Sequence, residues 1–179
     1  MTSLLKVDEI QDAAGKKILQ NTGGILQVKS TTKKDVFSTT SASFVDVTNL
    51  SVNITPTSSS SKILIMLNTM SSISSATAYL RVTGGNATDF VGDTDGVKVS
   101  ALTGIGRTVS GFDAGESGFA LSNSFLDSPA TTSQITYQVQ ARVSDSSSRT
   151  YTLNRCADES NHVYRGRYVS TITAIEISA

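Results

Sequence analysis

The feature that most constrains the fold of this chain is a run of five bulky apolar residues, from Ile63 to Leu67. Successive side chains of a β-strand point to opposite faces, so Ile63 and Ile65 share one side of such a strand. Leu64 and Met66 then share the other side. A strand that is apolar on both sides is covered on both sides. We expect a second sheet on one side, and a neighbouring subunit or a layer of loops on the other.

A shorter apolar stretch precedes this run and predicts a partner for it. Val52 to Thr55 alternates like a half-buried strand, and Pro56 with the small polar residues up to Ser61 is typical of a turn. We therefore predict a β-hairpin at the centre of a sandwich. The hairpin contains no carboxylate, histidine or cysteine, so we expect its role to be structural rather than catalytic.

Alternation elsewhere also favours antiparallel strands. Residues Ile135 to Val143 alternate between apolar and polar, which predicts a strand with one buried face. We expect Tyr151 to Asn154 to pair with it across the turn at Ser146 to Ser148. Ser170 to Ser178 should close the sheet, with Glu176 exposed. The abundance of Ser and Thr suits turns and the solvent faces of strands better than it suits helices.

These patterns together predict an all-β protein, an antiparallel β-sandwich with jelly-roll-like topology over residues 25–179. Residues 1–24 form a separate N-terminal segment for anchoring or docking, because their scattered apolar side chains have no core of their own. They would pack on the domain, on a sister subunit or on a docking partner. Two local structures remain open. One is a helical turn over Val7 to Ala14, and the other is a pair of short strands, Leu4 to Ile10 and Lys17 to Gln20.

Charge and cysteine usage exclude several classes of protein. Lys and Arg together number 15, as do Asp and Glu, so there is no basic surface of the kind that nucleic acid requires. The cluster of Lys29, Lys33 and Lys34 lies in an expected loop. The residues after Met1 lack the apolar core of a signal peptide, and no stretch is long enough to span a membrane. We expect folding in a cytoplasm, no membrane insertion and, with Cys156 alone, no intramolecular disulfide.

The sequence does not support an enzyme or a metal site. His162 is the single histidine, and no G-x-S-x-G motif accompanies it. One cysteine and one histidine cannot build a structural zinc site. Asp93 to Gly96 is similar to the start of a calcium loop, but the glutamate that completes such a loop is missing. We therefore expect no catalytic residues, no metal and no cofactor.

Two polar loop regions are candidates for binding, Gly92 to Gly118 and Asn161 to Arg167. In the second, Tyr164 can stack on a sugar ring, while Arg165 and Arg167 can pair with a carboxylate or a sulfate. These three residues are the predicted ligand-binding residues. The alternative is an ordinary loop that leads into the last strand.

Four stretches of the chain resemble a known group of proteins. They read LLKVDEIQDAAGKKILQNTGGILQV at the start, FSTTSASFVDVTNLSVNITPTSSSSKILIML in the first half, and SFLDSPATTSQITYQVQARV with STITAIEIS in the second half. In these stretches the chain resembles small tail-fibre-like virion proteins of bacteriophages, especially phages of marine bacteria and cyanobacteria. The resemblance is weakest between Gly84 and Gly115.

The resemblance implies a virion structural protein, a β-sandwich that forms a homotrimer and is anchored to other virion proteins by its N-terminal segment. It would be a tail fibre or appendage component that helps the virion attach to a host-surface glycan or protein. The alternative is a capsid decoration (cement) protein that clamps and stabilises the shell. The residues themselves favour a closed cyclic oligomer, because closed symmetry would bury the apolar side chains of the N-terminal segment.

Overall fold

The computed structural model describes residues 10–11, 13–14, 17–19, 24–73, 76–87, 90–106, 118–145, 149–158, 160–163 and 165–179. The twelve elements within these residues are all strands, which confirms the all-β prediction. None of the described residues forms a helix that is long and apolar enough to cross a membrane. The strands are β1 (Ile10–Gln11), β2 (Lys17–Leu19), β3 (Ile25–Lys33), β4 (Phe37–Thr39), β5 (Val45–Ile54), β6 (Lys62–Ile73), β7 (Ala78–Thr83), β8 (Thr103–Ile105), β9 (Phe119–Asp127), β10 (Ile135–Val143), β11 (Tyr151–Leu153) and β12 (Ser170–Ile177).

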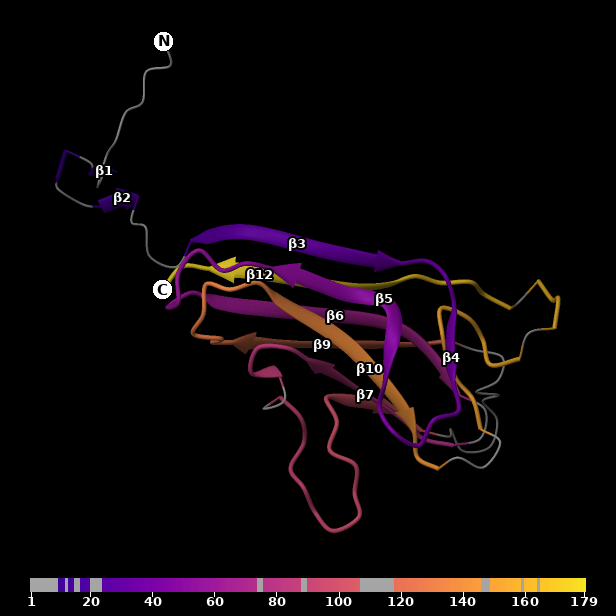
Figure 1. Ribbon diagram of the computed structural model, residues 1–179. Coiled ribbons are helices and arrows are strands. Elements are labelled where there is room, and N and C mark those ends of the chain that lie inside the picture. Colours follow the sequence, from indigo (N-terminus) through magenta and orange to yellow (C-terminus); the bar gives the residue numbers. More distant parts are fainter. Residues whose placement is uncertain are drawn as a thin grey trace.

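Two antiparallel sheets form the body of the protein (Figure 1). The larger sheet has the order β3-β12-β6-β11-β4, and β9 pairs with β6 as well. The smaller sheet has the order β5-β10-β7-β8. The two sheets enclose one apolar core, so the predicted sandwich is confirmed, whereas the jelly-roll-like topology is not. The core includes Leu50, Ile63, Ile65, Leu80, Val139 and Ile172.

The buried face of β10 is the one that its alternation of apolar and polar residues predicted. All five of its odd-numbered residues are buried, and the residues between them are exposed or partly exposed. The strand lies between β5 and β7 in the smaller sheet, and residues in its middle pair with both neighbours. A period of two is enough to define such a strand, because the pleat itself separates the two faces.

The central hairpin predicted from Val52 to Leu67 is wrong. β5 pairs with β10 in the smaller sheet, while β6 pairs with β12 and β9 in the larger one. The residues between them cross from one layer to the other instead of turning within a sheet. This crossing lets both strands bury an apolar face in the same core, where Ile54 and Ile63 are each at most 1% exposed.

The predicted pairing of Tyr151 to Asn154 with β10 is also wrong. β11 pairs with β4 and with the end of β6, both in the larger sheet. Its three residues are buried, so the strand belongs to the interior on both faces. Local alternation cannot reveal such a partner, because the partner strand is distant in the sequence.

The last strand is central rather than terminal in its sheet, and Glu176 is buried rather than exposed. β12 lies between β3 and β6, so Glu176 points into the protein on the same side as Ile172 and Ala174. Its Oε2 accepts a hydrogen bond of 2.6 Å from Gln27 Nε2. Its Oε1 accepts bonds of 2.7 Å from the Thr57 amide and 2.8 Å from the Thr57 hydroxyl. Burial raises the pKa of Glu176, but these hydrogen bonds outweigh burial and lower it to about 2.

In the N-terminal segment, the described residues agree with the strand interpretation. β1 and β2 pair antiparallel, with Ile10 opposite Leu19. Figure 1 draws this small hairpin beyond the end of the larger sheet at which β3 begins. Residues 1–9 lie outside the described residues, so the predicted start of the first strand at Leu4 stays a prediction.

Candidate functional site

A pocket of about 330 Å³ lies between the end of β11 and the start of β12. The residues that line it all fall between Arg155 and Arg167, so one segment of the chain builds the pocket. Arg165 and Arg167, both predicted as ligand-binding residues, are among them. Tyr164, the third predicted residue, lies outside the described residues.

Asn154 fixes both ends of this segment. Its φ of 64° is in the left-handed region, which asparagine tolerates better than most residues, and β11 ends immediately before it. The Asn154 side-chain amide donates bonds of 2.9 and 3.1 Å to the carbonyls of Lys33 and Asp35. The side-chain oxygen Oδ1 of Asn154 accepts a 2.6 Å hydrogen bond from the Ser170 hydroxyl at the start of β12. The two strands that bound the pocket are therefore tied to one buried residue.

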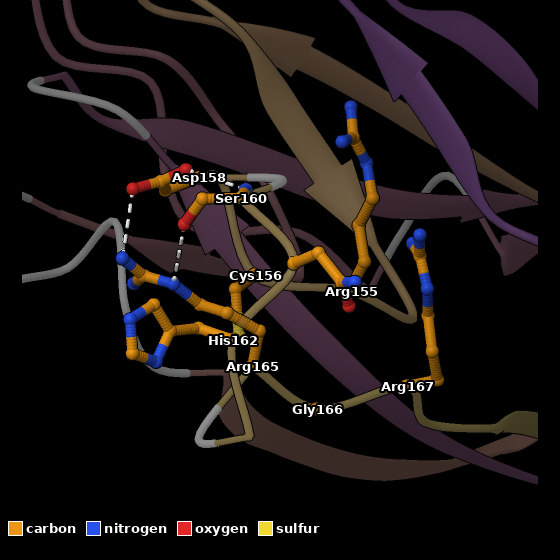
Figure 2. Close-up of a pocket in the computed structure, with 9 residues that line it drawn as sticks. Arg155, Cys156, Asp158, Ser160, His162, Arg165, Gly166 and Arg167 are labelled. Carbon is orange, nitrogen blue, oxygen red and sulfur yellow. Dashed lines mark hydrogen bonds and ion pairs between the residues drawn. The ribbon is translucent and has the colours of Figure 1, made fainter.

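Arg155 and Arg167 lie opposite each other in an isolated antiparallel bridge. Residues that face each other in such a bridge direct their side chains to the same side of the ladder. Figure 2 shows the two side chains running in a similar direction, away from the rest of the labelled polar groups. The structure thus brings together two arginines that are separated by eleven residues in the sequence.

Arg165 has a different role from Arg167. Its Nη2 donates a 2.8 Å bond to Asp158 Oδ2, and its Nε donates a 3.3 Å bond to the Ser160 hydroxyl (Figure 2). The Arg165 side chain is only 12% exposed. The Ser160 amide, followed by the charge of Arg165, lowers the pKa of Asp158 below its ordinary value. This ion pair closes the loop from 158 to 165 on itself, which makes Arg165 a residue that shapes the pocket.

Tyr168 explains the glycine between the two arginines. A β-carbon on Gly166 would lie 2.2 Å from the Tyr168 hydroxyl oxygen and 2.3 Å from its Cζ. On another side of the ring, a β-carbon on Gly118 would lie 2.7 Å from Tyr168 Cε2. The ring therefore fits only because both positions are glycine. The Tyr168 hydroxyl also lies 3.8 Å from the sulfur of the buried Cys156.

The segment from 155 to 167 can attract an anion. It carries three arginines against two acidic residues, Asp158 and Glu159. The exposed Arg167 guanidinium offers planar pairs of N–H donors that suit carboxylate, sulfate or phosphate oxygens, and Arg155 lies beside it with its Nε and Nη1 buried. His162, which is exposed at the pocket, can add a further donor. Within the described residues, no group of three or more His, Cys, Asp or Glu side chains is placed to hold a metal ion.

The two predicted binding loops do not come together in this pocket. The part of the first loop that the structure describes, 92–106, contributes none of the pocket's lining residues. It extends from β7 as a separate projection, seen as the long pink loop in Figure 1. Its residues 107–117 lie outside the described residues.

Arg155 is the residue that the sequence reasoning missed. Arg155 follows the buried strand β11 and is far in the sequence from the Arg165-Gly166-Arg167 motif. Only the bridge to Arg167 places it at the pocket. No local signal could have found it. No protein-family model and no curated protein matches this chain.

Proposed function

We propose that this chain is a bacteriophage virion structural protein, a tail fibre or appendage component that contributes to host-surface attachment. It would act as a homotrimer in the virion, held to other virion proteins by residues 1–24. The proposal rests on the likeness of four stretches to tail-fibre-like proteins and on the places of the N-terminal segment and the pocket in the fold. It requires neither an enzyme activity nor a cofactor.

The observation that carries the proposal is that the N-terminal segment and the pocket lined by Arg155 and Arg167 lie at opposite ends of β12. Gly24 donates its amide hydrogen to the Ser178 hydroxyl at the end of β12, so the N-terminal segment joins the body there. The pocket adjoins the start of the same strand, at Ser170. The eight residues of β12 separate the two by about 26 Å. A protein anchored at one end and binding at the other needs this arrangement.

The ligand of the pocket would be an anionic group on the host surface, such as a carboxylate or sulfate of a glycan. Arg155 and Arg167 would bind it, and Arg165 would keep the loop in shape. Single contacts of this kind are worth on the order of 1 kcal/mol at an exposed site. Several copies on one virion would act together and raise the overall avidity without new contacts.

The test is adsorption of virions to host cells with Arg155→Ala and Arg167→Ala combined in this protein. We expect adsorption to fall by at least about tenfold, because two anion contacts of roughly 1 kcal/mol are lost in every copy. Arg142→Ala is the matched control, since Arg142 lies on the smaller sheet beside Phe44 and outside the pocket. Unchanged adsorption in the double variant would contradict the proposal. If the variant capsids then disintegrate on mild heating, the cement alternative is favoured.

A further inference from the structure

The outer face of the larger sheet has no charged side chain in three consecutive rows. The register of β3, β12, β6 and β9 aligns these rows across the four strands. We call this surface the neutral face. Its rows are Val28, Ile175, Leu64 and Leu126; then Ser30, Thr173, Met66 and Ser124; then Thr32, Thr171, Asn68 and Ser122.

The neutral face leaves large apolar side chains in contact with water. Val28 is 55% exposed, Leu126 is 43% exposed and Met66 is 40% exposed, and they lie on three of its four strands. The opposite side of β6, by contrast, is buried by the smaller sheet, with Ile63 and Ile65 at 0% exposure. The described residues thus supply the expected cover for one side of the apolar run and only partial cover for the other. A continuous apolar row of this kind marks a surface that binds something.

The outer face of the smaller sheet is built in the opposite way. Arg81 Nε donates a 2.8 Å bond to Gln140 Oε1, and Gln140 Nε2 donates a 2.7 Å bond to Asp46 Oδ1. The Arg81 guanidinium lies 4.1 Å from the centre of the Phe44 ring. This ladder across β7, β10 and β5 presents the charges of Arg81 and Asp46, which are linked through the side-chain amide of Gln140. Among the residues that the structure describes, the three rows of the neutral face carry none of the charges that keep the other outer face in water.

We infer that the neutral face is covered by a second copy of this chain. A surface without charge accepts a partner surface without charge, because a charged partner would lose its hydration with no counter-charge to replace it. The neutral face is such a surface itself, so the same faces of neighbouring copies match one another around the axis of a closed oligomer such as the proposed homotrimer. Four of its seven polar side chains already have partners within the face, since Ser30 and Thr173 share a bond of 2.9 Å and Ser122 donates to Asn68 at 2.7 Å. Contact between two copies therefore leaves these groups satisfied.

The size of the face predicts how tightly the copies associate. With strands about 4.8 Å apart and rows about 6.7 Å apart, the three rows cover roughly 400 Å². A stable interface buries about 800 Å² on each partner. Leu26 and Val169, which are 42% and 52% exposed, extend the face beyond its two ends. We therefore expect a reversible assembly that forms at micromolar concentration and dissociates on dilution.

This inference rests on the part of the proposed function that concerns self-association, and it is independent of host attachment. The test is sedimentation velocity of the full chain over a range of micromolar concentrations. Ser124→Lys places a charge in the middle row at a position that is exposed in the single chain, so the variant should fold. Met66→Lys places a charge on the neighbouring strand. Thr136→Lys is the control, because Thr136 is exposed on the outer side of β10 in the other sheet.

We expect the native chain and Thr136→Lys to sediment as oligomers, and Ser124→Lys and Met66→Lys to sediment as monomers with unchanged circular dichroism. A native chain that is monomeric throughout the range overturns the inference, as does a Ser124→Lys chain that remains oligomeric. Should Met66→Lys not fold, Ser124→Lys alone decides the outcome. A monomeric native protein whose virions still need Arg155 and Arg167 for adsorption would refute this inference and leave the attachment proposal standing.

Discussion

Buried polar residues connect parts of this protein that are remote in sequence. Asp127, at the end of β9, accepts a 2.6 Å bond from the Tyr137 hydroxyl on β10 and a 3.1 Å bond from the Asn86 amide. The same carboxylate lies against Gly85, whose φ is +52°. Burial, followed by the adjacent Asp127 carboxylate, raises the pKa of Tyr137, so the phenol stays a hydrogen-bond donor. The Asp127 carboxylate thus joins three parts of the protein: the turn at Gly85 and Asn86, the edge strand β9 of the larger sheet, and the central strand β10 of the smaller sheet.

Gly85→Ala tests this meeting point. A β-carbon there would lie 2.1 Å from Asp127 Oδ2 and 2.9 Å from the Tyr137 hydroxyl, so the buried hydrogen bond would have to move. We expect the free energy of unfolding to fall by about 3 kcal/mol, from backbone strain and the disturbed bond together. Gly96→Ala is the control, because Gly96 has a similar φ of +57° with nothing within 4 Å of its β-carbon. Urea denaturation measures both, and equal losses would show that the contact with Asp127 contributes nothing.

At the scale of elements, the crossing from β5 to β6 is held by Glu176 of β12. The carboxylate binds Thr57 in the crossing and Gln27 in β3, so three separate elements share it. This arrangement stabilises the two-layer path of the chain, which a hairpin would not need. It also accounts for a buried carboxylate on the side of the strand that carries Ile172 and Ala174.

The folded-state pKa of Glu176, about 2, lies below its ordinary value of 4.5. The stabilisation from its charged form is therefore complete above pH 4.5 and is lost as the pH falls toward 2. We expect Glu176→Gln to lower the free energy of unfolding by about 2 kcal/mol at neutral pH, because charged hydrogen bonds are lost. Thermal unfolding across this pH range measures the difference, which should shrink as the native carboxylate becomes protonated. A difference that is constant with pH would contradict the assigned pKa.

At the scale of the whole molecule, the N-terminal segment and the sandwich have separate tasks in our proposal. Removal of residues 1–23 keeps Gly24, which exchanges hydrogen bonds with Ser178 in both directions. We expect the shortened protein to retain its β-sheet circular dichroism and to melt within a few degrees of the full chain, because β3 remains paired with β12. On the anchoring hypothesis, it should no longer be incorporated into virions. Incorporation at the native level would show that the anchor lies elsewhere.

The sequence by itself determined the class of fold and the faces of the main strands. Alternation in β10 and the apolar run in β6 each depend on the pleat of a single strand, so residues close together in the sequence carry the whole signal. Strict alternation along β12 is enough to put Glu176 on the side of Ile172 and Ala174, but its charge led to the wrong prediction that it is exposed. The Arg165-Gly166-Arg167 motif, which the sequence singles out, lies in the segment that lines the pocket.

Only the tertiary structure decided which strands are neighbours and what the pocket contains. β5 and β6 belong to different sheets, and β11 pairs with β6 rather than with β10. Arg155 reaches the pocket only through its bridge to Arg167. Pairing depends on how two sheets close around a common core, and many partners are compatible with the same alternation. The burial of Glu176 has the same origin, since the hydrogen bonds that stabilise its charge come from Gln27 and Thr57, more than a hundred residues away in the chain.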